Sequence, residues 1–245
     1  MLAQGFRVDL AALEAAITPR TRALFFATPN NPSGVILSAT ELAVIGNLAR
    51  RHSLWLVADE VYAGLAPGGR VPSLAAALPE QVVTISSLSK SHSMPGWRAG
   101  WLVGPRQLVA HAEAMAQCML FGLPGFIQEA AVTALRVSDA AESRVREYCA
   151  VRRDFFLAGL RGMRGLECFV PDAGMFLLVD VRGTGLTGYD FMCELYRTER
   201  VSVLDGGAFG RETSGFVRVC FATDEALLRE AMVRIRRFVG KEVRV

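Results

Sequence analysis

The sequence SSLSKSHSMPGWRAGW, residues 86–101, decides how this chain is interpreted. It follows an apolar run, places Lys90 among small hydroxyl residues and places Arg98 eight residues later. A lysine that binds a cofactor aldehyde must reach it from the end of a strand, and hydroxyl and guanidinium groups are the donors that a phosphate prefers. We therefore interpret Lys90 as an attachment site and Arg98 as a phosphate ligand, although an isolated S-x-S-K tetrapeptide is usually a polar surface loop.

The segment SLSK, with the arginine of GWR eight residues beyond its lysine, resembles the class I and II aminotransferases. These are pyridoxal-phosphate (PLP) enzymes of the aspartate-aminotransferase fold type, and the resemblance covers nearly the whole chain. It implies that Lys90 forms a Schiff base with PLP and that Ser87 and Arg98 hold the cofactor phosphate. The hydroxyl of Ser89 is a further donor in the same segment.

Length and composition favour a protein that acts on small molecules. The chain has 245 residues, enough for two domains, and its net charge of +3 is spread without a basic block. A nucleic acid or an acidic membrane surface is therefore not expected as a partner. The five cysteines show no C-x-x-C spacing and the three histidines form no cluster, so we expect neither disulfides nor a metal site. Without a signal sequence or a membrane-spanning run, a cytoplasmic location is expected.

The first part of the chain alternates short apolar runs with helical patterns. The predicted strands are residues 22–27, 54–59, 82–87 and 99–104, and the predicted helices are residues 6–17 and, behind the capping-box sequence SATE, 38–52. This order is typical of a parallel sheet, whose ligands bind outside the carboxyl ends of the strands. Asn31, Asp59 and Lys90 each follow a different strand, so we expect one shared crevice. A cis bond between Asn31 and Pro32 is expected because it turns the side chain back toward that crevice at small cost.

The second part predicts three helices followed by a small α+β domain. The helices are residues 107–118, 125–137 and 143–160; the strands are 166–171, 174–181, 201–205 and 216–222, with further helices at 189–200 and 224–239. The predicted fold class is α/β, a PLP-dependent transferase of fold type I. We expect a partial large PLP-binding domain with a parallel-type sheet, bridging helices and a C-terminal small domain, at residues 1–110, 111–160 and 161–245.

Asp59 ends an apolar strand, where an unpaired carboxylate is costly, so we expect it to have a cationic or donor partner. The resemblance assigns this partner as the pyridinium nitrogen of PLP, whose pKa a neighbouring carboxylate raises. Tyr62 lies three residues on, so one turn places its hydroxyl on the side of Asp59. The family pattern assigns Tyr62 and Asn31, which begins N-P-S-G, to the ring oxygen of the cofactor. The structural alternatives are a helix cap, a packing tyrosine and a turn asparagine.

Arg218 interrupts the apolar strand FVRVCF, where a guanidinium is costly without an anion. A substrate α-carboxylate would bind it through two hydrogen bonds. The resemblance assigns this role to Arg218 and places Asn31 beside the substrate. The alternative is an arginine on a solvated edge strand.

The reaction implied is transamination between an amino acid and a 2-oxo acid, with Lys90 as general acid and base and with Asp59 and Tyr62 as the other catalytic residues. Residues 87–105 and 118–131 look most like arginine:pyruvate transaminases. A PLP-dependent β-lyase on the same scaffold, a non-catalytic PLP-binding domain and an inactive fragment are the alternatives.

The usual subunit of the family has a long N-terminal part with no counterpart in these 245 residues. That part supplies a helix N-terminus for the phosphate, an aromatic ring that stacks on the cofactor and several strands. Because 51% of the residues are hydrophobic, we expect exposed apolar surface on this chain. Because the phosphate contacts of that helix N-terminus are missing, we also expect weak PLP binding and little transamination from this chain alone. The resemblance implies a homodimer in the full-length form. Measuring PLP affinity and transamination beside an N-terminally extended form tests this expectation.

Overall fold

The computed structural model describes residues 4–241, which form two compact units. The first unit comprises residues up to 30 together with 35–146, and the second comprises residues 31–34 and 147 onward. The long helix α6 (Ser138–Leu160) contributes residues to both units, beginning five residues earlier than expected from the sequence. The division into 1–110, 111–160 and 161–245 remains a prediction.

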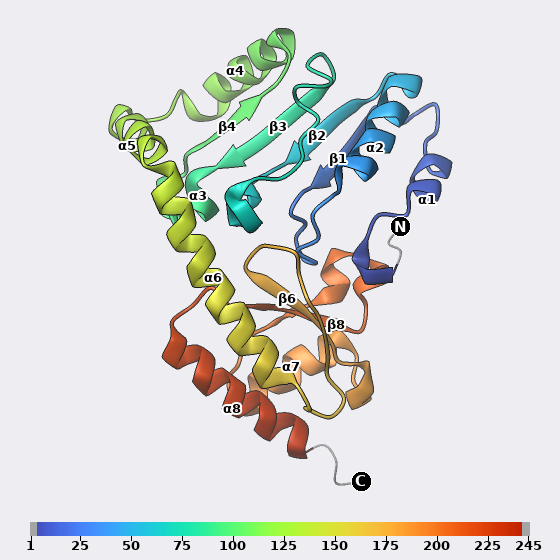
Figure 1. Cartoon of the computed structure of the whole chain (residues 1–245), viewed down its shortest axis with the longest axis vertical. Helices are drawn as coiled ribbons and strands as arrows, with labels where there is room; N and C mark the ends of the chain where they lie inside the picture. The colour runs from blue at the N-terminus through green and yellow to red at the C-terminus, as the bar shows by residue number, and fades with distance from the viewer. Residues whose placement is uncertain (1–3, 242–245) are drawn as a thin grey trace. The chain divides into compact units, whose positions relative to one another are not determined.

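The first unit is built on a four-stranded sheet in the order β1 (Ala23–Ala27), β2 (Trp55–Asp59), β3 (Val82–Ser87) and β4 (Gly100–Val103), as Figure 1 shows. The first three strands are parallel, as predicted, whereas β4 is antiparallel to β3. The predicted parallel-type sheet is therefore a mixed sheet, with β4 antiparallel at its edge. The link from β3 holds only the one-turn helix α3 (Leu88–Ser91) and the turn η4 (Pro95–Trp97), and a parallel crossover usually needs a full helix.

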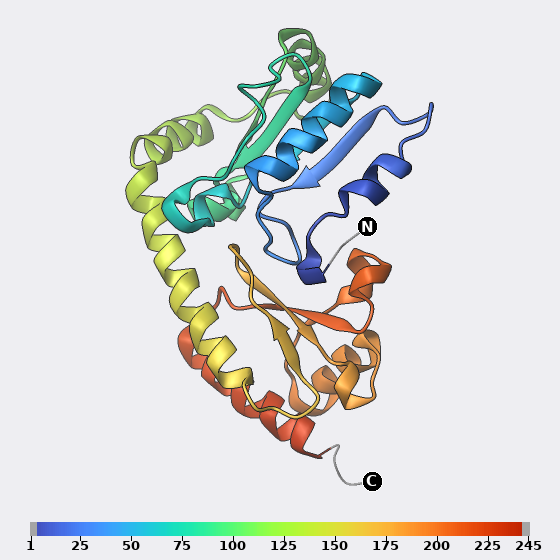
Figure 2. The ribbon, with the colours of Figure 1, turned by 45° about the vertical axis from the view of Figure 1, so that its right-hand side comes forward.

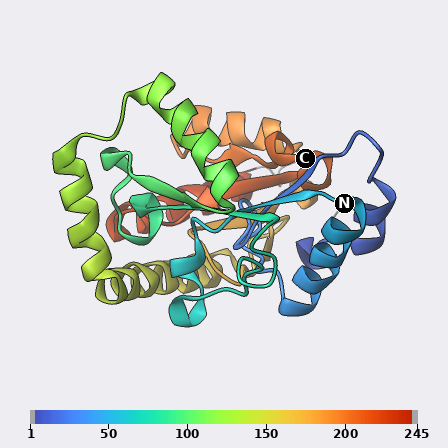
Figure 3. The same ribbon diagram turned by 90° about the horizontal axis from the view of Figure 1, so that it is seen from above.

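The core of this unit lies on one face of the sheet, under α1 (Leu10–Ala15) and α2 (Ala39–His52). It contains Ile45 and Leu42 of α2 packed with Leu56 of β2. Helix α4 (Arg106–Leu120) lies on the opposite side of the strands in Figure 3 and has no buried residue. The exposed apolar surface expected from the composition is present here, since Phe121 after α4 is 94% exposed and Phe25 of β1 is 68% exposed.

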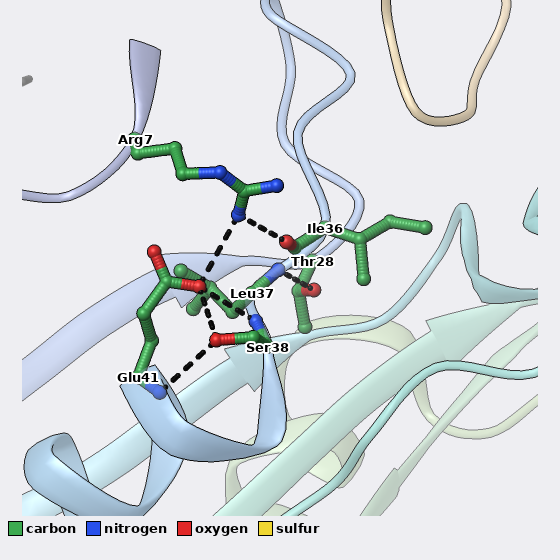
Figure 4. Close-up of polar contacts among 6 residues, drawn as sticks. All are labelled: Arg7, Thr28, Ile36, Leu37, Ser38 and Glu41. Atoms are coloured by element: carbon green, nitrogen blue, oxygen red, sulfur yellow. Dashed lines mark hydrogen bonds and ion pairs between the residues drawn. The ribbon is translucent and has the colours of Figure 1, made fainter. Parts of the chain in front are cut away.

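Figure 4 shows the polar contacts that begin α2. The Ser38 Oγ accepts from the Glu41 backbone N at 3.2 Å, and the Glu41 carboxylate accepts from the Ser38 backbone N at 2.7 Å, so the predicted capping box is confirmed. Arg7 donates to the same carboxylate at 3.2 Å. Burial alone would raise the pKa of Glu41, but the hydrogen bonds from Ser38 and the charge of Arg7 outweigh it and lower the pKa. The segment between β1 and α2 is held at both ends by one hydrogen bond, in which the hydroxyl of the buried Thr28 accepts from the backbone N of Leu37.

Replacing Ser38 with alanine is expected to destabilise the first unit by about 1 kcal/mol, because α2 loses its N-terminal hydrogen bond. All three tryptophans lie in this unit, so urea unfolding followed by tryptophan fluorescence reports on it. The matched control is Thr187→Ala, which removes the N-cap of α7 (Gly188–Glu199) in the second unit and should leave the tryptophan transition in place. An unchanged midpoint in Ser38→Ala would contradict the prediction.

The second unit is an antiparallel sheet with helices packed on it, so the predicted α+β arrangement is confirmed. Its strands, in spatial order, are β5 (Glu167–Phe169), β6 (Phe176–Asp180), β8 (Phe216–Cys220) and β7 (Leu204–Asp205). Helix α8 (Glu225–Lys241) packs on α7, where the rings of Phe191 and Phe238 meet edge to face at 5.2 Å. Figure 2 shows both helices with the sheet they accompany. Central strand β6 is almost wholly buried, which gives β8 beside it a rigid support.

Candidate active site

Lys90 is held beyond the end of β3 by the helix α3. Ser87 caps this helix, and its Oγ accepts a hydrogen bond from the backbone N of Ser89 at 3.2 Å. Leu88 is 1% exposed and anchors the turn in the core. The Nζ of the half-buried Lys90 lies 5.9 Å from the ring centroid of Tyr62. The structure thus brings together two of the residues predicted to be catalytic.

Asp59 is the last residue of β2, and Tyr62 lies three residues beyond it. In the sheet register Asp59 lies opposite Ile85 of β3, two residues before Ser87. Its Oδ1 accepts from the backbone N of Val61 at 3.0 Å, so this local contact uses only one of its two oxygens. The Tyr62 side chain is 6% exposed. The carboxylate, the phenol and the amine of Lys90 therefore come from adjacent strand ends of one unit.

Glu60, the residue after Asp59, differs from it in its surroundings. Its Oε1 is buried and has no hydrogen-bond partner in the described part of the chain. Burial raises the pKa of Glu60, and a hydrogen bond from Ser73 only partly offsets this effect. The end of β2 therefore carries two neighbouring carboxyl groups in different environments, and Glu60 is a natural comparison for Asp59.

The segment after α3 contains two non-glycine residues in the left-handed region, Ser93 and Arg98, both with φ of 54°. Such conformations cost roughly 1–2 kcal/mol each and concentrate at functional sites. The exposed Arg98 donates from Nη1 to the carbonyl of Pro95 at 2.7 Å. A guanidinium has five N–H donors, so Arg98 keeps several for a ligand in the unit that holds Lys90 and Ser87.

Gly100 allows β4 to approach Ser87 closely. The two residues are partners in the β3–β4 register. A Cβ on Gly100 would lie 2.9 Å from the carbonyl oxygen of Ser86 and 3.0 Å from the Cβ of Ser87. Only glycine fits without displacing the residue that caps α3. The sequence reading of GWR as a phosphate-binding pattern did not include this steric role.

Asn31 and Arg218 meet in the second unit, where the Nη1 of Arg218 donates to the Oδ1 of Asn31 at 2.8 Å. The bond from Asn31 to Pro32 is cis, which confirms the prediction; the bond from Thr28 to Pro29 is also cis and was not anticipated. The two residues assigned to the substrate are thus in direct contact. A single crevice shared by Asn31, Asp59 and Lys90 remains a prediction.

Two aromatic residues that the sequence reading missed flank Arg218. Its guanidinium carbon lies 4.6 Å from the ring centroid of Phe176 and 5.0 Å from that of Phe209. Its Nε is buried without an acceptor, and no carboxylate of the described residues forms an ion pair with it. The sequence could not predict these two contacts, because Phe176 lies on β6 and Phe209 lies in a turn before β8, both far from Arg218 along the chain.

The family model described as "Aminotransferase class I and II" matches residues 2–235. The chain belongs to the class I and II aminotransferases. The arginine–pyruvate transaminase of Pseudomonas aeruginosa is 43% identical over 233 residues, covering 94% of this chain and 59% of that protein. The aspartate aminotransferase of Rhizobium meliloti is 36% identical, and the match covers 94% of this chain and 60% of that protein. This aminotransferase chain therefore spans about three-fifths of the relatives that it matches.

Solved structures agree with the fold of this aminotransferase chain. The aromatic aminotransferase from Pyrococcus horikoshii OT3 superposes with a TM-score of 0.90 at 32% identity, covering 97% of this chain and 64% of that one. The N-succinyldiaminopimelate aminotransferase from Mycobacterium tuberculosis superposes with a TM-score of 0.90 at 34% identity, covering 96% and 63%. The predicted fold type I assignment is confirmed.

The class I and II aminotransferases depend on PLP, and the donor set of this chain fits that group. A primary amine, a phenol and a carboxylate occupy adjacent strand ends. Ser87 and Arg98 supply hydroxyl and guanidinium donors suited to a phosphate, with Gly100 providing the close backbone approach. Among residues 4–241, no group of three or more His, Cys, Asp or Glu side chains is arranged to hold a metal ion. No helix within the same range is long and apolar enough to cross a membrane.

Proposed function

We propose that this chain supplies the catalytic and cofactor-binding residues for PLP-dependent transamination between an amino acid and a 2-oxo acid. The observation that carries the proposal is the placement of Lys90 beside Tyr62, with its Nζ 5.9 Å from the ring, at the strand end next to Asp59. PLP, when bound, supplies an electron sink for the carbanion formed at the substrate α-carbon.

The residues of the first unit have distinct roles in this proposal. Lys90 forms the covalent link to the cofactor and, once displaced by substrate, moves the proton at the α-carbon. Asp59 keeps the cofactor ring nitrogen protonated through its negative charge. Tyr62 donates a hydrogen bond to the ring oxygen, and Ser87, Ser89 and Arg98 bind the phosphate.

The residues of the second unit bind the substrate and assist the cofactor. Arg218 binds the α-carboxylate of the substrate, with Asn31 holding the guanidinium through the contact at 2.8 Å. Asn31 also donates to the ring oxygen of the cofactor. A half-buried guanidinium whose buried Nε has no hydrogen-bond partner among residues 4–241 supports the carboxylate role, because a buried donor of a charged group is costly when unpaired.

Labelling tests the assignment of Lys90. The chain has only two lysines, Lys90 and Lys241. Purified protein incubated with PLP is expected to show visible absorbance, and borohydride reduction followed by peptide mass mapping should place the cofactor on Lys90. Lys241→Arg is the matched control and should label fully. A reduced cofactor on Lys241, or one retained in Lys90→Ala, would show that the assignment is wrong.

Gly100→Ala is expected to weaken PLP binding roughly tenfold or more. The new methyl group displaces Ser87, and a charge-assisted hydrogen bond to phosphate contributes about 1.5–3 kcal/mol. Fluorescence titration with PLP measures the effect. The control is Gly96→Ala in the same segment, because a Cβ there meets nothing within 4 Å. Equal PLP affinities for the two variants would contradict the role of Gly100.

The substrate pair that we propose is arginine with pyruvate, supported by the 43% identity to the arginine–pyruvate transaminase of P. aeruginosa. Rates with arginine, alanine and aspartate as amino donors test it, and comparable rates would reject this narrower proposal. Product analysis separates transamination, which yields the 2-oxo acid of the donor, from β-elimination, which yields ammonia and pyruvate.

The homodimer and the cytoplasmic location are parts of the same proposal. Exposed apolar side chains on α4 and after it, including Met119 at 72% and Phe121 at 94%, favour association. The family resemblance implies two copies of the subunit. Sedimentation equilibrium over a range of protein concentrations measures the state of association, and a monomer throughout that range would exclude the dimer.

A further inference from the structure

The rings of Phe176 and Phe209 both contact the guanidinium of Arg218. Phe176 is 4% exposed and lies on β6, while Phe209 is 37% exposed and ends the turn η6 (Gly206–Phe209). Ring centroids at 4.6 and 5.0 Å from the guanidinium carbon are within cation–π distance. One ring is therefore part of the core, whereas the other is a partly exposed cover.

The turn that carries Phe209 is held rigidly. The buried Thr213 donates from its hydroxyl to the carbonyl of Gly206 at 2.7 Å and lies 2.9 Å from that of Gly210. Gly206 has no space for a side chain, since a Cβ would lie 2.4 Å from the Thr213 carbonyl oxygen. These contacts hold the backbone of the turn from which the Phe209 ring projects.

Arg218 makes three contacts in the second unit. Its guanidinium carbon lies 4.6 and 5.0 Å from the centroids of the two rings, and Asn31 accepts from Nη1 at 2.8 Å. Its Nε is left buried without an acceptor in the described chain. A guanidinium that is already held in one orientation loses less conformational freedom when an anion binds. The Nε side of the guanidinium is out of contact with solvent, and a less hydrated cation attracts a carboxylate more strongly.

We propose that Phe209, with Phe176, is a positioning residue that holds Arg218 ready for the carboxylate of the substrate. The inference rests on the proposed function, because it takes Arg218 as the group that binds the α-carboxylate. Phe209 is the informative member of the pair, since its ring is partly exposed whereas truncation of Phe176 would open a cavity in the core.

Protection of Arg218 from phenylglyoxal tests the proposal without requiring turnover. The full chain, incubated with PLP, is modified in the presence of increasing pyruvate, and peptide mass spectrometry follows Arg218. In Phe209→Leu the pyruvate concentration for half-protection is expected to rise several-fold, up to about 30-fold, the range of a cation–π contact. Phe209→Tyr should restore the wild-type value, because it keeps the aromatic face. The matched control is Phe155→Leu, which removes a ring 4.9 Å from Arg229 and should change nothing.

The outcomes distinguish the positioning role of Phe209 from the carboxylate-binding role of Arg218. If pyruvate protects Arg218 equally well in wild type and Phe209→Leu, the positioning role is wrong while the carboxylate role of Arg218 stands. If pyruvate fails to protect Arg218 in the wild type, both the carboxylate role and the positioning role are overturned. A rise in Phe209→Leu that Phe209→Tyr does not reverse would also reject the aromatic mechanism.

Discussion

Replacing Lys90 with alanine is expected to lower the rate of transamination by roughly 10²- to 10⁴-fold or more. That range is typical of losing a positioned general acid and base, and the variant also loses the covalent link to PLP. Lys90 lies with its Nζ 5.9 Å from the Tyr62 ring, beyond the end of β3, the strand that pairs with the one ending at Asp59. Single-turnover and steady-state rates measure the effect, in whichever form of the protein, this chain or an N-terminally extended one, shows wild-type activity.

Lys241→Arg is the control for Lys90→Ala and should keep the wild-type rate. The comparison is direct because these two residues are all the lysines of the chain. A Lys90→Ala variant that retains more than a tenth of the wild-type rate would mean that another group moves the proton. Circular dichroism should show unchanged secondary structure, since the Lys90 side chain forms no ion pair among the described residues.

Replacing Asp59 with asparagine is expected to lower the rate by roughly 10²- to 10³-fold, the usual effect of removing one preorganised electrostatic partner. The amide keeps the size of the side chain but cannot balance a positive charge on the cofactor ring nitrogen. The hydrogen bond from the Val61 backbone N ends on Oδ1 and can still be accepted by an amide oxygen, so folding should be retained. Rates and the visible spectrum across pH measure the change.

Glu60→Gln is the matched control for Asp59→Asn. It neutralises the next carboxyl along the chain, whose pKa burial already raises and whose Oε1 has no partner in the described chain. The variant should keep most of the activity. Equal losses in the two variants would show that negative charge at the end of β2, rather than the specific contact of Asp59, is what matters.

The sequence by itself determined most of the elements and the residue types at the site. Short apolar runs and period-3.6 patterns placed β1 to β3, α2, β6 and β8 close to their observed bounds, whereas β7 begins three residues later than predicted. The SATE sequence determined the start of α2, because a capping box is a local interaction between Ser38 and Glu41. Asp59 was identifiable because a carboxylate at the end of an apolar strand needs a partner, and Lys90 because it follows another apolar run. The roles of Lys90 and Tyr62 came from the resemblance to the class I and II aminotransferases.

Only the tertiary structure decided what depends on contacts between distant segments. One such feature is the antiparallel direction of β4, and another is the close approach of β4 to β3 that requires Gly100. A third is the contact of Arg218 with the rings of Phe176 and Phe209. In each case the interacting atoms come from different strands or turns, and no spacing along one segment records which residues meet. Burial of the Arg218 Nε likewise results from the packing of β6, β8 and η6 together. The sequence therefore determines which functional groups are present, whereas the fold determines which groups they contact.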